Sequence, residues 1–369
     1  MIVWRAVRSG WGQAVLAVLL FAFALFLIWW RGPDWGSVLE AFSLVVWSWI
    51  LLAFLLNVVS TLFRALSWRL TIGQALPEKH QPKLIHVLSA FGVGLFANAA
   101  LPGRLGELAR VATLRRHLPD APPGTTAVLV GTVFAHRLFD IVPATILVIW
   151  VLATAEVPHW AVVAILIVAG VAFALFTAAW LGARRHHRPM VMDGMGSVRR
   201  LLVMARTGLS VLKAPVPLAG AILLQCLGWL LQLFAVWVAM KAFDIDAPLP
   251  AAGLVLVLMN IATIVPLWPG NVGLVQAAVA IPLRNGYGVP VATGFAFGLA
   301  LQALEMACGV GLGLLALARE GISLAVLRRM QDDEGDSSEN AVEEVHELER
   351  DIEESSEQPA AREGASLSR

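Results

Sequence analysis

The sequence predicts an all-α protein that crosses a membrane several times, and two observations carry this prediction. First, 58% of the 369 residues are hydrophobic and only 14% are charged, whereas soluble domains carry about 25% charged residues. Second, the hydrophobic residues gather into long runs, which match the roughly 20 residues that a helix needs to span a bilayer. The mean hydropathy of +0.75 agrees with this class.

Six of these runs are long enough for full spans. We place them at 12–30, 43–63, 125–152, 160–182, 216–240 and 290–317. The first run follows a basic start but lacks a small-residue cleavage site, so we expect an uncleaved span and not a secretory signal. Cys226 and Cys308 both lie inside apolar runs, and no disulfide framework is therefore expected.

Positive charge indicates which connections face the cytoplasm. Arg5 and Arg8 place the N-terminus inside, and the basic residues within 64–83 place the second connection there too. If the run 84–101 crossed fully, the four arginines that follow it would lie outside, against this rule. This run is therefore not expected to be a simple span.

We predict instead two broken, re-entrant hairpins. The segment 84–116 enters and leaves on the cytoplasmic side. The run 273–283 has only 11 residues and is too short to cross, so 250–284 forms a second hairpin, entered from the outside. This layout places 20 basic residues inside and 3 outside, with both termini cytoplasmic.

Two further segments lie outside the spans. Residues 193–213 repeat apolar side chains at helical spacing among basic ones, which is typical of an amphipathic helix in the cytoplasmic interface, although an ordinary basic linker fits as well. Residues 331–369 carry 14 acidic and 3 basic side chains, which leaves 12 acidic and 24 basic ones in 1–330. This tail has too little apolar surface to fold alone, and we expect it to be disordered, either simply solvated or docking a partner.

A short phrase occurs twice. PGRLG spans 102–106 and PGNVG spans 269–273, 167 residues later, and each follows an apolar run with an asparagine, Asn98 or Asn260. Proline fits the first turn of a helix, and glycine permits the backbone of a break. Because the hairpins enter from opposite sides, the phrase predicts an inverted repeat whose broken helices line a polar cavity, as in many transporters.

The first break carries charges that we expect to bind a ligand. Arg104 and Arg110 would hold an anion, with Glu107 one helical turn from each to orient them. Asn98 and Gly103 complete this break, where free N–H groups at a helix start can also receive an anion. The alternative is structural: Glu107 neutralises its neighbours, and the arginines only set the orientation.

More ionisable groups lie inside spans, where they are costly and are functional candidates. His136, Arg137 and Asp140 share a helix face by their spacing, either as an inner wall of the site or as a self-satisfied pair near the interface. Glu305, one turn from Gln302, is interpreted as a buried carboxyl, a substrate ligand or a proton site. The second break completes the set with Asn260, Pro269, Gly270, Asn271, Gly273 and Gln276.

Three stretches together resemble a known family. NAALPGRLGELARVATLRRH (98–117), HRLFD (136–140) and PLWPGNVGLVQAAV (266–279) are similar to the transmembrane, flippase-like domain of bacterial lysylphosphatidylglycerol synthases. The resemblance spans roughly residues 10–320. It implies helices with re-entrant segments and a role in moving or binding lipids. Many relatives carry Glu in place of Gln276 and Glu-Arg in place of His136-Arg137. We expect no counterpart after Arg329 of the soluble aminoacyltransferase domain that follows in full-length relatives, and therefore no synthesis of aminoacylated lipid.

We therefore expect a flippase-like protein of the bacterial cytoplasmic membrane that binds an anionic phospholipid or lipid-linked precursor and moves it between leaflets. The basic excess favours an anionic lipid over a cationic one, for which Asp140 and Glu305 would be the acceptors. The alternative is a scaffold that regulates a lipid-modifying or glycosyl-transferring enzyme through its acidic tail. We expect no enzymatic activity, metal, cofactor or nucleic-acid partner, because no His/Cys cluster or nucleophile–base pair stands out.

Overall fold

The computed structural model describes residues 33–100, 106–122, 124–184, 214–264 and 271–321. Over these residues the protein is helical and no strand occurs, in agreement with the expected all-α class. Several predicted features lie outside the described residues, namely the span 12–30, the interfacial helix 193–213, the acidic tail 331–369, Gly103, Arg104, Pro269 and Gly270.

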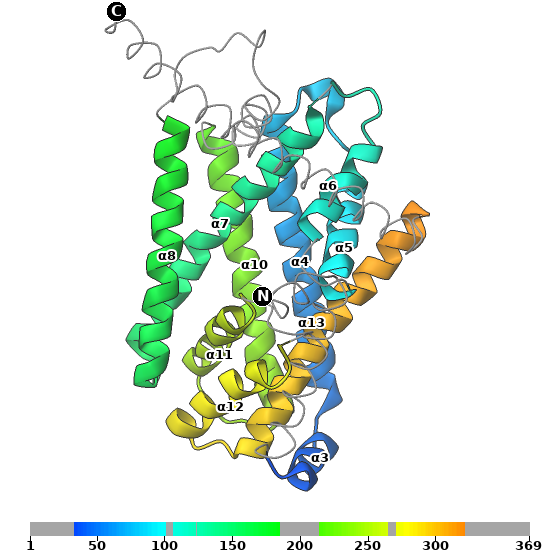
Figure 1. The fold of residues 1–369 in the computed structure, drawn as a ribbon. Coiled ribbons are helices and arrows are strands. Elements are labelled where there is room, and N and C mark those ends of the chain that lie inside the picture. Colours follow the sequence, from blue (N-terminus) through cyan, green and yellow to red (C-terminus); the bar gives the residue numbers. More distant parts are fainter. Residues whose placement is uncertain (1–32, 101–105, 123, 185–213, 265–270, 322–369) are drawn as a thin grey trace, which may run out of the picture.

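Four of the described helices are long and apolar enough to cross a membrane. They are α4 (Trp47–Ala75), α7 (Thr125–Thr154), α10 (Pro215–Ala242) and α13 (Val291–Glu320). Helices α7, α10 and α13 coincide closely with expected spans. A further helix, α8 (His159–Arg184), covers the expected span 160–182 and stands beside α7 at the side of the bundle (Figure 1).

Helix α4 differs from its expected bounds, because it does not end at residue 63 but continues through Ala75. Positive charge in the sequence predicts that Arg64 and Arg69 lie in a cytoplasmic connection. In the structure both are helical and have partners: Arg64 Nη2 donates to Gln232 Oε1 at 2.5 Å, and Arg69 donates to the Pro82 carbonyl. A charged residue that forms hydrogen bonds within the protein does not have to end an apolar helix.

Helices α4 and α10 form a long antiparallel pair (Figure 1). The Ser60 hydroxyl donates to the Gly228 carbonyl at 2.7 Å, and further along α4 the Ser67 hydroxyl donates to the Ala221 carbonyl at 2.9 Å. Small residues allow this close approach, since a Cβ at Gly228 would lie 3.3 Å from the Ser60 carbonyl oxygen.

The first break joins two short helices, α5 (Leu84–Ala100) and α6 (Gly106–Arg116). They pack as an antiparallel hairpin in which Gly94 faces Gly106 so closely that a Cβ at either position would meet the other's carbonyl oxygen. The Asn98 side chain accepts a hydrogen bond from the Gly106 N–H at 2.9 Å. It thereby satisfies one of the N–H groups that a helix start leaves without an intrahelical partner.

The second break joins α11 (Leu249–Ala262) and α12 (Leu274–Tyr287). Here too amide side chains satisfy the backbone: Asn271 Nδ2 donates to the Ala262 carbonyl at 2.7 Å, and Gln276 Oε1 accepts from the Gly273 N–H at 2.5 Å. Asn271 and Gly273 both have a positive φ, of 46° and 91°, which glycine and asparagine tolerate best. Both breaks are therefore stabilised by amide side chains.

The two hairpins pack against opposite halves of α13. Gly92 of α5 faces Leu312 and Ala316, where a Cβ would lie 2.9 Å from the Ala316 Cβ. Gly313 faces Phe96 in the same contact. Residues of α12 instead meet the first half of α13, since a Cβ at Gly298 would lie 3.1 Å from the Gln276 Cα. Figure 1 shows α5–α6 and α11–α12 towards opposite ends of the bundle.

The described helices repeat one order. Helices α4, α5, α6 and α7 run long, short, short, long, and α10 to α13 do the same. This order is what an internal repeat produces. The orientation of each half across the membrane, the re-entrant course of the hairpins and the cytoplasmic position of the termini stay predictions.

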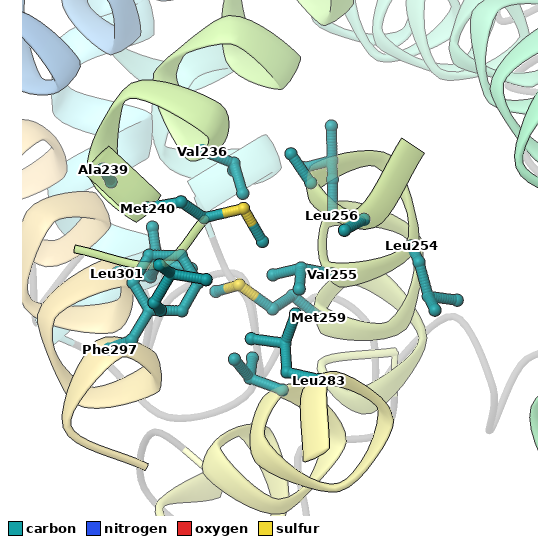
Figure 2. Packing of buried hydrophobic residues seen from close by; sticks show 14 of the residues in the cluster. Val236, Ala239, Met240, Leu254, Val255, Leu256, Met259, Leu283, Phe297 and Leu301 are labelled. Carbon is teal, nitrogen blue, oxygen red and sulfur yellow. The ribbon is translucent and has the colours of Figure 1, made fainter. Parts of the chain in front are cut away.

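The largest buried cluster surrounds the second hairpin. Residues 251–259 of α11 are buried without a break, as expected for a helix covered by protein on every side. Figure 2 shows Met240, Met259, Leu283 and Phe297 of α10 to α13 converging there. The short helix α3 (Trp35–Ser43), capped by Asp34, closes this end with Trp35 edge-on to Phe295.

Candidate functional site

Residues from both halves of the chain line one cavity of 650 Å³. Its polar lining comes from α5, α6, α7, α10, α11 and α13 and the turn after α11, and comprises Asn98, Glu107, Arg137, Asp140, Thr145, Trp229, Asn260, Thr263 and Glu305. Six of these residues were predicted from sequence, four in the first half (Asn98, Glu107, Arg137 and Asp140) and two in the second (Asn260 and Glu305). Asn98 and Asn260 each lie two residues before the end of the helix that precedes a break.

Arg137 of α7 forms ion pairs with two carboxylates of the cavity lining, one on α6 and one on α7. One nitrogen, Nη2, donates to Glu107 Oε1 of α6, and Nη1 lies 3.5 Å from Asp140 Oδ2 on its own helix. The sequence spacing predicts that Glu107 orients Arg104 and Arg110, its neighbours along the chain. In the structure Glu107 pairs with Arg137, because the fold brings α6 against α7.

Arg110 is not among the described residues that line the cavity. Its side chain is only 4% exposed, and its guanidinium carbon lies 4.7 Å from the Trp68 ring centroid and 5.6 Å from that of Phe91. Cation–π contacts of this kind stabilise a desolvated guanidinium. Its placement therefore supports a role behind the cavity wall and not direct contact with a ligand.

Asp140 is held by donors from α10. Trp229 Nε1 donates to its Oδ1 at 2.8 Å, and Gln225 Nε2 donates to the same oxygen. With Arg137 it has three donor groups, as a carboxylate removed from water requires. Asp140 is the sixteenth of the 30 residues of α7, so it lies at the middle of that helix and not near an end.

The His136 side chain does not join the hydrogen bonds around Asp140. It is 2% exposed, and its Nε2 lies 3.0 Å from the Arg64 carbonyl of α4. The i, i+4 spacing places His136 and Asp140 on neighbouring parts of the helix surface, but the His136 side chain contacts α4 whereas the Asp140 side chain accepts from α10. Among the described residues, His136 therefore supports the wall and does not line the cavity.

Sequence reasoning missed three polar residues of the cavity lining, Thr145, Trp229 and Thr263, and three beside it, Arg64, Gln225 and Gln232. Arg64 donates to Gln232 Oε1 and lies over the Trp229 ring, 5.3 Å from its centroid. Gln232 Nε2 in turn lies 3.4 Å from Glu305 Oε1. The signal was present in α10, where Gln225, Trp229 and Gln232 follow one another at i, i+4 and i+7 and so share one face of an otherwise apolar helix.

The remaining residues of the second break hold its shape. Gln276 is fully buried, and its Nε2 donates to Gln302 Oε1 at 2.7 Å while its Oε1 accepts from Gly273. Asn271 is bonded to the Ala262 carbonyl. These four residues, Gln276, Gln302, Asn271 and Gly273, are not among the described residues that line the cavity, whereas Asn260 is.

The described cavity lining holds more acidic than basic side chains, although basic residues outnumber acidic ones in 1–330. It holds three carboxylates, Glu107, Asp140 and Glu305, and one guanidinium, Arg137. Arg64 and Arg110 contribute further positive charge from behind the wall. The cavity therefore offers both hydrogen-bond acceptors and a cation, together with apolar side chains such as Ile141, Val257 and Ile264.

Long apolar helices around a charged cavity define an integral membrane protein. Residues 14–313 match the family model described as "Lysylphosphatidylglycerol synthase TM region", and the chain belongs to this family. The match confirms the resemblance noted in the sequence and links this membrane protein to lipid handling. No curated protein and no solved structure matches the chain.

Proposed function

We propose that the protein binds the polar headgroup of a membrane phospholipid in this cavity and moves the lipid between the two leaflets. The observation that carries the proposal is the joint lining of one cavity by charged residues from both halves of the chain. Ionisable groups inside spanning helices are costly and usually serve a ligand or ion pathway. Asp140 and Glu305 lie at the middle of two 30-residue helices.

The size and lining of the cavity suit the region where a headgroup meets its acyl chains. Sites for small ligands typically measure about 300 to 1,000 Å³, and this one measures 650 Å³. Its charged wall would receive the headgroup. Apolar residues of the same lining, among them Ile141, Ala144 and Ile264, would receive the upper part of the chains, which remain in the apolar phase.

Arg137 is the residue that we assign to the lipid phosphate. Its side chain is 49% exposed, although it is paired with Glu107 and Asp140, so part of the guanidinium remains accessible. Guanidinium groups bind phosphate through directed, charge-assisted hydrogen bonds. The amide oxygens of Asn98 and Asn260 would accept from hydroxyl or amine groups of the same headgroup. A phosphate lipid that also carries such donors fits better than a bare phosphate.

The test is leaflet exchange in liposomes that contain the purified full-length protein. Fluorescent phosphatidylglycerol, phosphatidylethanolamine and polyprenyl phosphate are compared, with Arg137→Ala as the site variant. The control is Arg284→Ala on α12, a residue outside the cavity lining. We expect exchange of at least one lipid by the wild type and the control, and a loss to the rate of empty liposomes in Arg137→Ala.

Two results would contradict the proposal. One is exchange that Arg137→Ala leaves unchanged. The other is the absence of exchange of every lipid by wild-type protein that is folded by circular dichroism. If a deletion of 331–369 then abolished the binding of a lipid-modifying enzyme, the scaffold hypothesis would replace this one.

A further inference from the structure

Glu305 differs from the other carboxylates of the cavity because it has no ion pair within the described part of the chain. It is the fifteenth of the 30 residues of α13. Its hydrogen-bond donor is the Gln232 amide, with 3.4 Å between Nε2 and Oε1. Glu107 instead pairs with Arg137, and Asp140 has Arg137, Trp229 and Gln225.

The nearest positive charge is held away from Glu305 by a neutral side chain. Arg64 Nη2 donates to Gln232 Oε1 at 2.5 Å, and the other end of the same amide faces Glu305. Arg64 Nε is buried and has no hydrogen-bond partner among the described residues. Arg64 therefore has a donor without a partner among the described residues. The Gln232 amide lies between Arg64 and the Glu305 carboxyl.

Four helices around the cavity contribute charged or polar side chains near Glu305. Helix α4 contributes Arg64, α10 contributes Gln232, α7 contributes Arg137 and Asp140, and α6 contributes Glu107. Both nearby acids and Arg137 are already paired with one another. This leaves Arg64 as the described cation that a small movement could bring to Glu305.

A carboxyl group in an apolar bundle has two stable forms. Without a cation it is neutral and carries a proton, because an isolated buried charge is very costly. With a guanidinium in direct contact it can be ionised. Glu305 has no ion pair within the described part of the chain, which favours the first form, and direct contact with Arg64 would favour the second.

We propose, resting on the proposed function, that Glu305 is a proton-binding site that couples lipid movement to proton movement. In one state the Glu305 carboxylate takes a proton from water on one side of the membrane. In the other state Arg64 contacts Glu305, and the proton passes to water on the opposite side. No bond other than that to the proton changes, and the gradient of protons across the membrane supplies the driving force.

The first test measures lipid and proton movement together. Full-length protein is placed in liposomes with a pH-sensitive dye inside, and a pH difference of either direction is imposed. The wild type should exchange lipid severalfold faster with one direction of the gradient than with the other, with a matching proton movement. Glu305→Gln, which keeps the shape and the contact to Gln232, should exchange lipid at one rate whatever the gradient and move no protons. Glu305→Asp should keep part of the gradient response.

The control is Glu320→Gln at the end of the same helix. Glu320 accepts from the Ser89 hydroxyl at 2.5 Å and lies 2.7 Å from His117 Nε2, away from the cavity lining. It should retain the gradient response of the wild type. Equal gradient responses in wild type and Glu305→Gln would overturn the proposal. So would a loss of exchange in Glu305→Gln that is confined to amine-bearing lipids, since Glu305 would then be a headgroup ligand.

A second readout separates this proposal from the proposed function. Infrared difference spectra of the purified protein, recorded between two pH values, report the carbonyl band of a protonated carboxylic acid. We expect a band that is lost in Glu305→Gln and kept in Glu320→Gln. Presence of this band without lipid exchange would reject lipid translocation but retain the proton site. Lipid exchange without the band would retain translocation and reject the proton site.

Discussion

Ser60 and Gly228 meet where α4 crosses α10, with 2.7 Å between the serine hydroxyl and the glycine carbonyl oxygen. They lie 168 residues apart, and the two Pro-Gly phrases start 167 residues apart. The helices are antiparallel, so a two-fold axis through this crossing would bring equivalent residues of two repeats face to face. The spacing of this contact agrees with the predicted repeat, which stays a prediction.

This crossing predicts a large cost for a side chain at position 228. In Gly228→Val the new Cβ would lie 3.1 Å from the Arg64 Cγ and 3.3 Å from the Ser60 carbonyl oxygen, and overpacking costs about 1 to 3 kcal/mol. We expect a lower midpoint of thermal unfolding in detergent. Gly311→Val is the matched control, because nothing lies within 4 Å of a Cβ there. Equal midpoints for the two variants would contradict this assignment of the helix crossing.

The donor from Trp229 to Asp140 predicts a second measurable cost. Trp229→Phe keeps an aromatic ring and removes the N–H that donates to Asp140 at 2.8 Å, and a hydrogen bond to a charged group contributes about 1.5 to 3 kcal/mol. Unfolding in denaturant should show a loss of that order. In an Asp140→Asn background the same substitution should cost less, because the charged acceptor is gone.

A natural control for this prediction lies on the same helix. Trp237 Nε1 is buried without a hydrogen-bond partner among the described residues. Trp237→Phe should therefore cost much less than Trp229→Phe. If Trp237→Phe were the more costly change, the hydrogen bond to Asp140 would not be the source of the effect.

The ion pair between Glu107 and Arg137 predicts coupling between α6 and α7. A double-mutant cycle with Glu107→Gln and Arg137→Gln should give a coupling free energy of about 1 kcal/mol, because both side chains are partly exposed and solvent screens the pair. Unfolding free energies of the four proteins measure it. Independent, additive effects would show that the two side chains do not pair in solution.

The cap at the first break predicts a local effect. Asn98→Ala leaves the Gly106 N–H without its acceptor at 2.9 Å, and loss of a helix N-cap costs about 1 kcal/mol. Hydrogen exchange should become faster in α6. Asn98→Asp keeps an acceptor oxygen and should leave exchange there close to that of the wild type. Unchanged exchange in Asn98→Ala would place the acceptor elsewhere.

Much of the fold could be predicted because it depends on local sequence. Hydrophobic runs define α7, α10 and α13 nearly to the residue, and the Pro-Gly phrases mark where the short helices separate. The positions of Asn98, Arg137 and Asp140 along their helices were also local information. These residues were therefore expected near a break or inside a span, where the structure has them.

The rest depends on contacts between distant segments. A local reading ends the second span at Arg64, because the partner that keeps this arginine in the helix is Gln232, 168 residues away. Arg110 was expected to face a ligand, but its helix α6 has only 11 residues, and its orientation is decided by Trp68 and Phe91. The pairing of Glu107 with Arg137 is likewise set by tertiary structure.

The glycine contacts between α5, α6 and α13 have a consequence for genetics. At Gly94, Gly106 and Gly313 even one added methyl group would meet backbone or side-chain atoms of the facing helix. Saturation mutagenesis should therefore find its least tolerant positions here, at glycines that are not among the described residues of the cavity lining. Loss of activity in a variant does not by itself identify the ligand site, because a packing defect has the same effect. Only variants that retain normal abundance in the membrane can locate it.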